Sequence, residues 1–172
     1  MKPIVAALIV SLIALPVRAE GTNFVTDSPS PFAHPTTDAM GETHFSGRAV
    51  VSGNFVALWE DPGEGEVPYL VVRFRPDSKS KSVLPYETGR NQVEEVWLSN
   101  TDKALALLVP QSTRIQLIAK RVTKAEGVAR IVITSYTTRV DCDVRGYSAR
   151  ILSARLRAKV VTAQVPFREA SC

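Results

Sequence analysis

The sequence predicts a mainly β fold, a small β-barrel of OB-like type with one short helix between its third and fourth strands. Two observations support this prediction. β-branched and aromatic residues cluster in short runs separated by turn-forming residues, which is typical of a β-rich domain. A stretch with helix start and stop signals follows the third run. Three strands, a helix and a two-stranded hairpin form the element order of an OB barrel, and a β-sandwich, which accommodates the same order, stays the alternative.

The first 19 residues have the pattern of a secretory signal peptide. Lys2 precedes an apolar stretch over residues 4–17, and Ala19 supplies a small residue at the cleavage position. The apolar stretch is shorter than the roughly 20 residues that a transmembrane helix requires. We therefore expect residues 1–19 to be removed from an exported protein, periplasmic or secreted, that has no transmembrane anchor.

The remainder of the chain divides into a leader and one domain. Residues 20–43 are rich in proline and show no hydrophobic period, which predicts an extended or disordered leader. Removing 19 of the 172 residues leaves 153, a length typical of one domain with one core. We expect residues 44–172 to form that single β-rich domain.

The first three strands are separated by clear turn signals. Asp, Pro and Gly at residues 61–65 predict a hairpin turn between the first two strands. Gly47 and Gly53 lie within the first strand, where glycine tolerates a bulge or a sharp bend. The three predicted strands cover residues 45–59, 69–75 and 93–98.

A short helix is predicted over residues 103–109. Ser99 and Asp102 have the spacing of a capping box immediately before this apolar stretch. Pro110 ends the pattern, because proline cannot continue a helix. The helix should therefore span about two turns.

Strands are predicted again in the last third of the chain. Residues 114–124 and 128–140 are rich in β-branched residues, and residues 125–127 between them predict a hairpin turn. The apolar spacing over residues 147–165 suits either a helix or a strand pair, and we favour a strand for its first half.

The chain contains two cysteines, Cys142 and Cys172. In an oxidising compartment two thiols of one domain most simply pair, so we predict a disulfide that ties the C-terminal tail to the domain. Neither cysteine belongs to a Cys-x-x-Cys pair, which makes a reactive or intermolecular thiol the less favoured alternative.

Charge is distributed unevenly along the chain. Residues 20–102 carry 6 Lys and Arg against 13 Asp and Glu, a net charge of −7. Residues 103–172 carry 13 against 4, a net charge of +9. The two halves either neutralise each other in the fold or leave a basic face for an anionic partner. The candidate anion-contact residues, on the strands predicted there, are Lys120, Arg121, Lys124, Arg130 and Arg139.

The expected partner is an anionic protein, a polysaccharide or the surface of the cell envelope. Nucleic acid is disfavoured, because base stacking requires aromatic residues among the cations and only Tyr136 and Tyr147 lie nearby. Trp59 and Trp97 offer either an interaction surface or ordinary core residues, and we favour the core.

Groups suited to catalysis are few. His34 lies in the predicted leader and His44 at the edge of the domain, and the sequence has no Gly-x-Ser-x-Gly nucleophile elbow. The four carboxylates within residues 60–66 lack the spacing of a calcium loop and predict a solvated hairpin tip. We assign no catalytic, cofactor-binding or metal-binding residue. We favour a non-enzymatic exported binding or interaction module whose basic second half contacts an anionic partner, with a small secreted hydrolase, its site assembled from dispersed residues, as the alternative.

Overall fold

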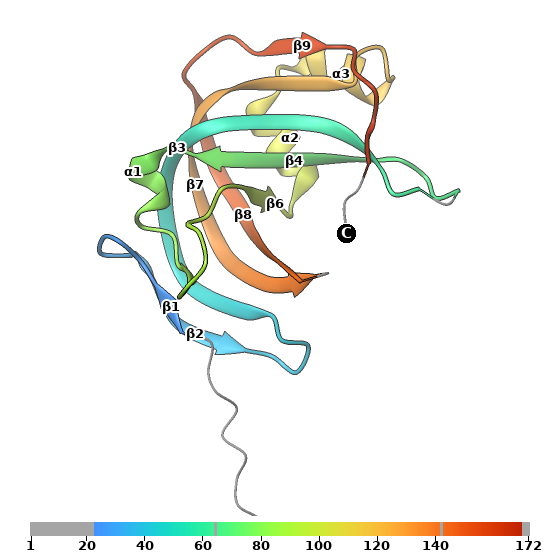
Figure 1. The fold of residues 1–172 in the computed structure, drawn as a ribbon. Helices are drawn as coiled ribbons and strands as arrows, with labels where there is room; N and C mark the ends of the chain where they lie inside the picture. The colour runs from blue at the N-terminus through green and yellow to red at the C-terminus, as the bar shows by residue number, and fades with distance from the viewer. Residues whose placement is uncertain (1–22, 64, 142, 170–172) are drawn as a thin grey trace, which may run out of the picture.

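The computed structural model describes residues 23–63, 65–141 and 143–169 (Figure 1). Most of its strands belong to one sheet, so the mainly β fold is confirmed. The strands are β1 (Phe24–Val25), β2 (Phe32–Thr37), β3 (Thr43–Asp61), β4 (Tyr69–Pro76), β5 (Tyr86–Glu87), β6 (Val96–Leu98), β7 (Lys124–Asp141), β8 (Val144–Leu156), β9 (Val161–Ala163) and β10 (Arg168–Glu169). The helices are α1 (Ser78–Lys81), α2 (Thr101–Leu108) and α3 (Gln111–Ile118).

Five strands of the sheet form a ring. Their order is β3-β4-β6-β8-β7, and β7 pairs again with β3. β6 and β8 are parallel, and the other neighbours in the ring are antiparallel. Because side chains alternate along a strand, one face of each strand points into the ring and forms the core. The buried residues on these inner faces include Ala49, Val51, Phe55, Val72, Phe74, Ile131, Ile133 and Ile151.

Two glycines of β3 allow other chain segments to approach closely. The pairing of β3 with β7 shifts register between Phe45 and Arg48, so the bulge predicted at Gly47 is confirmed. Gly47 has a φ of +129°, and a Cβ there would lie 2.2 Å from the carbonyl oxygen of Pro31. At Gly53 a Cβ would lie 2.1 Å from the carbonyl oxygen of Arg75 on the neighbouring strand β4. Glycine is therefore required at both positions by the packing of the backbone.

Strand β2 lies in the stretch predicted as an extended or disordered leader, yet it belongs to the main sheet, so the domain includes residues before residue 44. β2 pairs with β3, and Phe32 of β2 is only 6 % exposed. Its ring stacks on that of Tyr136 at 5.0 Å between centroids. The leader is anchored because its aromatic residues reach the core. The prediction relied on its proline content, which does not indicate such contacts.

The predicted capping box before α2 is wrong. Asn100 occupies the N-cap position, and its side chain bonds both the backbone N–H and the carbonyl of Ile151 on β8. The hydroxyl of Ser99 donates to the carbonyl of Ala149. Both residues therefore join the helix to the sheet and leave its first turn without a side-chain cap.

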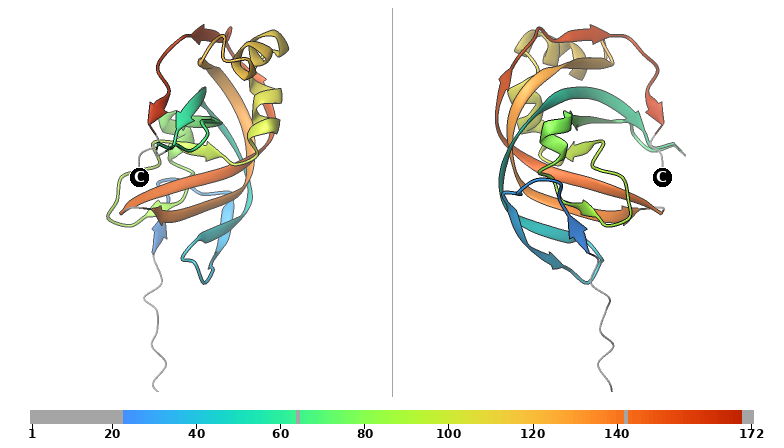
Figure 2. Two further views of the ribbon diagram at one scale, coloured as in Figure 1. Left: turned by 90° about the vertical axis from the view of Figure 1, so that its right-hand side faces the viewer. Right: turned by 60° about the vertical axis from the view of Figure 1, so that its left-hand side comes forward.

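A second helix stands where a strand was predicted. Residues 114–118 belong to α3, which starts after Pro110 and ends before Lys120, a residue with φ of +55°. The β-branched residues of this stretch favoured a strand, but Leu117 alone turns fully into the core. Figure 2 shows α2 and α3 together at one end of the ring, far from the N-terminal strands.

The predicted turn at residues 125–127 is also wrong. Ala125 and Glu126 lie within β7 and pair with Ala57 and Val56 of β3. Gly127 is small because the ring of Phe55 packs against it, and a Cβ there would lie 2.8 Å from that ring. The hairpin of β7 instead turns between Asp141 and Val144. β8 then confirms the strand favoured for the start of residues 147–165.

Some predictions concern residues that the structure does not describe. The signal peptide over residues 1–19 lies outside the described residues, as do Cys142 and Cys172 with their predicted disulfide. Among the described residues, no helix has the length and apolar character needed to cross a membrane.

Candidate functional site

The five predicted anion-contact residues do not form one surface. Lys120 and Arg121 follow α3, whereas Arg130 lies in the middle of β7 and Arg139 near its end. Lys124 begins β7 and pairs with Glu126 at 2.6 Å. The prediction placed Lys120 and Lys124 on one face of a strand, beside a second strand that carries Arg130 and Arg139. This arrangement is lost because residues 114–118 of the first predicted strand form a helix.

A different set of arginines shares one face of the ring. Arg48 of β3 and Arg150 of β8 both pair with Thr134 of β7. Four residues before Thr134, Arg130 pairs with Arg155 of β8. All four arginines are exposed, whereas inward-facing residues such as Ala49, Ile131 and Ile151 are buried in the core. Arg150 and Arg155 share the outer face because the pairing of β7 with β8 shifts register between Val132 and Ile133. We call the surface formed by Arg48, Arg130, Arg150 and Arg155 the arginine face.

No ion pair neutralises the arginine face in the described part of the chain. None of its four guanidinium groups forms an ion pair with a described carboxylate, although nine ion pairs of other Lys and Arg side chains join described residues. Arg130 and Arg155 even lie directly opposite each other, an arrangement that costs stability in an isolated sheet. The face is therefore electropositive and suited to an anion.

Apolar side chains are interleaved with these arginines. Val50 of β3 is 51 % exposed and pairs with Val132 of β7, between the two ranks of arginine. Val128, two residues from Arg130 along β7, is 39 % exposed. The face thus combines cations with a small apolar strip.

A groove of about 990 Å³ lies over another part of the ring. Trp97 of β6 lines it and is 39 % exposed, so this indole is on the surface, contrary to the favoured core assignment. Arg73 of β4 pairs with Trp97, and its Cζ lies 6.0 Å from the centre of the indole ring. Other lining residues are Arg90, Gln92, Glu95, Arg139, Arg145, Tyr147, Ser148 and Arg168.

The cations of this groove are neutralised, unlike those of the arginine face. Nη2 of Arg73 lies 2.6 Å from Oε1 of Glu60, and its Nη1 donates to Glu95 at 2.7 Å. Glu95 also accepts from Arg75 at 3.0 Å and lies 3.8 Å from Arg168. Burial alone would raise the pKa of Glu95, but the hydrogen bonds and charges of Arg73 and Arg75 hold it below its ordinary value. This network fixes the groove and leaves little net charge for a ligand.

Glu60 illustrates how the acidic turn differs from its prediction. The four carboxylates of residues 60–66 were expected at a solvated tip, but Glu60 is 1 % exposed. Its Oε1 forms an ion pair with Nη2 of Arg73 at 2.6 Å that lacks hydrogen-bond geometry, and Nε of Arg73 is buried without a hydrogen-bond partner. This carboxylate serves as a structural ion partner at the edge of the groove.

Trp59 and Lys120 are structural. The indole N–H of Trp59 donates to the carbonyl of Leu117 in α3 at 2.9 Å, which confirms its place in the packing of the domain. Nζ of Lys120 lies 4.5 Å from the centre of the Trp59 ring. Lys120 is therefore held in a cation–π contact, although the residue is exposed.

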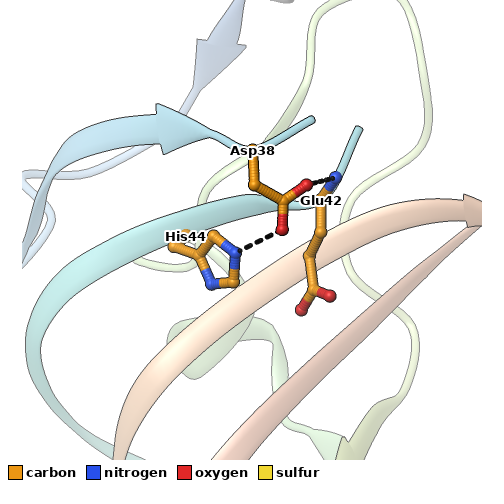
Figure 3. Close-up of side chains that lie close together, drawn as sticks. All are labelled: Asp38, Glu42 and His44. Atoms are coloured by element: carbon orange, nitrogen blue, oxygen red, sulfur yellow. Dashed lines mark hydrogen bonds and ion pairs between the residues drawn. The ribbon is translucent and has the colours of Figure 1, made fainter. Parts of the chain in front are cut away.

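Asp38, Glu42 and His44 lie close together at the turn between β2 and β3 (Figure 3). One ligand atom from each lies within 4.8 Å of the others, a set that sequence spacing did not reveal. Oδ1 of Asp38 accepts from the backbone N–H groups of Met40 and Glu42, and Oδ2 lies 3.2 Å from Nε2 of His44. The hydrogen bond with His44, with those of the turn, lowers the pKa of Asp38. The cluster is explained as a capped turn, since Asp38 is already fully engaged within it.

Comparison of the chain with protein-family models, with curated proteins and with solved structures gives no match. Its function is therefore argued from the two surfaces of the ring, the arginine face and the groove.

Proposed function

We propose that this chain is an exported, non-enzymatic binding module with an OB-like barrel, and that its arginine face contacts an anionic partner. The observation that carries the proposal is the set of four exposed arginines on three paired strands, none of them ion-paired with a described carboxylate. Guanidinium groups suit this role, because they stay charged and bind carboxylate or phosphate through two donors.

The ring supports the OB-like part of the proposal. Numbered from β3 as the first strand, its order is 1-2-3-5-4 with strand 4 returning to strand 1. The chain reaches the ring strand β7 from β6 through helices, as an OB barrel does, although here there are two, α2 and α3. A barrel of this kind presents its outer faces to partners while its interior is filled by side chains.

The cost of the arginine face also supports a binding role. Like charges directly opposite each other destabilise a strand pair. If stability alone had selected these residues, a carboxylate would be expected opposite Arg130. Arg73 in the groove has such partners, Glu60 and Glu95. An anion bound over Arg130 and Arg155 would relieve this repulsion.

A salt-dependent binding measurement tests the proposal. The processed protein, purified after export, is applied to immobilised heparin as a probe polyanion, and the salt concentration of elution is recorded. The variant Arg48→Gln/Arg130→Gln/Arg150→Gln/Arg155→Gln should elute at much lower salt, because each lost phosphate- or sulfate-type contact reduces the salt dependence.

The matched control removes the same charge elsewhere. Lys79, Lys103, Arg114 and Arg121 lie on or after the helices, and none is ion-paired with a described carboxylate. Their Gln variants should elute close to the unmodified protein. Equal losses in both fourfold variants would show that net charge alone governs retention, and the proposed site would be wrong.

The exposed indole in the groove favours a second function, the binding of a polar, uncharged ligand with one apolar face, such as a sugar. The groove cations are neutralised, so hydrogen bonding and contact with Trp97 would dominate. Titration with neutral oligosaccharides should change the fluorescence of the protein and leave that of a Trp97→Phe variant unchanged.

A further inference from the structure

We infer that the anionic partner of the arginine face is the surface of a phospholipid bilayer that contains acidic lipids. This inference rests on the proposed function and specifies the partner of the same face. Its evidence is the arrangement of the arginines and the exposed valines on the same face.

The arginines are distributed over an area and not along a line. Arg48 and Arg150 flank Thr134 in one rank, whereas Arg130 and Arg155 form a second rank four residues away along β7. Four residues of strand span about 13 Å, and two strand spacings across β3, β7 and β8 span about 10 Å. A single polyanionic chain would follow one row of cations, whereas a layer of acidic headgroups meets both ranks together.

Two exposed valines favour the bilayer further, Val50 between the two ranks and Val128 just beyond the rank of Arg130 and Arg155. Val50 is 51 % exposed and Val128 is 39 % exposed on the same face. A soluble polyanion offers these side chains no apolar environment, but the boundary between headgroups and acyl chains does. Arginine suits the rim of such a contact, because its stem lies along apolar surface while the guanidinium reaches the phosphates.

The curvature of the ring presents these residues at an outer face. β3 and β7 bend together around the ring, as Figure 1 shows, so their outward side chains point away from the core. This part of the surface is separate from the groove, because the first residue of β7 that lines the groove is Thr137. Contact with a bilayer through the arginine face would therefore leave the groove accessible.

Vesicle binding tests the inference. Cosedimentation of the processed protein is measured with vesicles of phosphatidylcholine and phosphatidylglycerol and with vesicles of phosphatidylcholine alone. Binding should require phosphatidylglycerol and decrease with salt. Each cation near an acidic surface strengthens binding roughly fivefold, so the fourfold arginine variant should bind at least about 100-fold more weakly. The helix control, Lys79→Gln/Lys103→Gln/Arg114→Gln/Arg121→Gln, should keep most of the binding.

A valine variant separates a bilayer from a soluble polyanion. Val50→Ser keeps every charge, so its retention on heparin should be unchanged, while its binding to acidic vesicles should fall severalfold because the apolar contact is lost. Circular dichroism of each variant confirms that it is folded before binding is compared.

The outcomes distinguish the inference from the function on which it rests. If the arginine face retains the protein on heparin but the protein does not bind acidic vesicles, the bilayer inference is wrong and the proposal of an anionic partner stands. The inference is also wrong if vesicle binding falls equally in both fourfold variants, or if Val50→Ser binds acidic vesicles as strongly as the unmodified protein. If the unmodified protein binds neither heparin nor acidic vesicles, the proposed function itself is wrong.

Discussion

Arg130 of β7 and Arg155 of β8 lie directly opposite each other in an antiparallel strand pair. Both are exposed, and neither is ion-paired with a described carboxylate. The pair opposes folding slightly in the free protein and becomes favourable when an anion lies over it. Stability and binding should therefore respond in opposite directions to a change at this pair.

The variant Arg155→Glu is expected to separate the two properties. It converts a repulsive cross-strand pair into an attractive one, so the free energy of unfolding should rise by about 0.5 to 1 kcal/mol. Retention on heparin should fall at the same time. Urea unfolding at low salt measures the first effect, and a decrease in stability would show that the arginine pair is not under repulsion.

Removing Arg73 should strongly destabilise the domain. Glu60 is buried and has Arg73 as its charge partner, so Arg73→Met leaves a carboxylate without compensation at the edge of the core. We expect the free energy of unfolding to fall by about 3 kcal/mol. The double variant Arg73→Met/Glu60→Gln should recover part of this loss in denaturant unfolding. If the double variant is no more stable than the single one, the pair is not coupled.

Stability should decrease below the ordinary pKa of a glutamate. The hydrogen bonds from arginines outweigh burial and lower the folded-state pKa of Glu87 and Glu95 from 4.5. A group of this kind contributes stability above its unfolded pKa, and this contribution is lost as pH falls through the lower folded value. The Tm should change little from pH 7 to 5 and fall below pH about 4.5.

The variant Glu95→Gln provides the control for this pH dependence. It should have a lower Tm at pH 7 and should lose less stability on acidification, because one of the carboxyl groups with a lowered pKa is absent. An acid profile with the same slope as that of the unmodified protein would exclude Glu95 as a source of the effect.

Gly53 should not tolerate a side chain. A Cβ would lie 2.1 Å from the carbonyl oxygen of Arg75, and neither strand can move without disturbing the ring. Gly53→Ala should lower the free energy of unfolding by about 2 kcal/mol or more. Gly146→Ala is the matched strand control, because the nearest atom to its Cβ would lie 3.9 Å away. Similar stabilities of the two variants would contradict this account.

Much of the first half of the fold was predictable from local signals. The hairpin of β3 and β4 follows from a Pro-Gly turn between two runs of alternating residues, and its register confirms it. α2 follows from an apolar run that ends at a proline. These features depend on residues close together in the sequence.

The errors occur where distant contacts outweigh local preference. α3 contains β-branched residues, but it forms a helix that packs Leu117 into the core beneath Trp59. Gly127 resembles a turn residue, but it is small because Phe55, 72 positions earlier, packs against it. The leader was expected outside the domain, but Phe32 reaches Tyr136. A single sequence contains no signal for such pairings.

The candidate site was predictable in kind but not in place. The basic second half of the chain predicted an anion-binding surface, yet of the five predicted residues only Arg130 lies in the arginine face. Arg48 comes from the acidic half and could not be assigned by counting charges. Its position beside Thr134 depends on the register of β3 with β7, which the bulge at Gly47 adjusts.

The sequence by itself determined the mainly β class, the first hairpin and the charge asymmetry of this protein, because alternation, turn residues and composition act over short distances. Only the tertiary structure decided that the strands close into a ring, that the carboxylates gather around Arg73, and that four arginines remain exposed without a described counter-charge. Strand pairing decides these features, since a shift of one residue in register moves every side chain to the opposite face of the sheet.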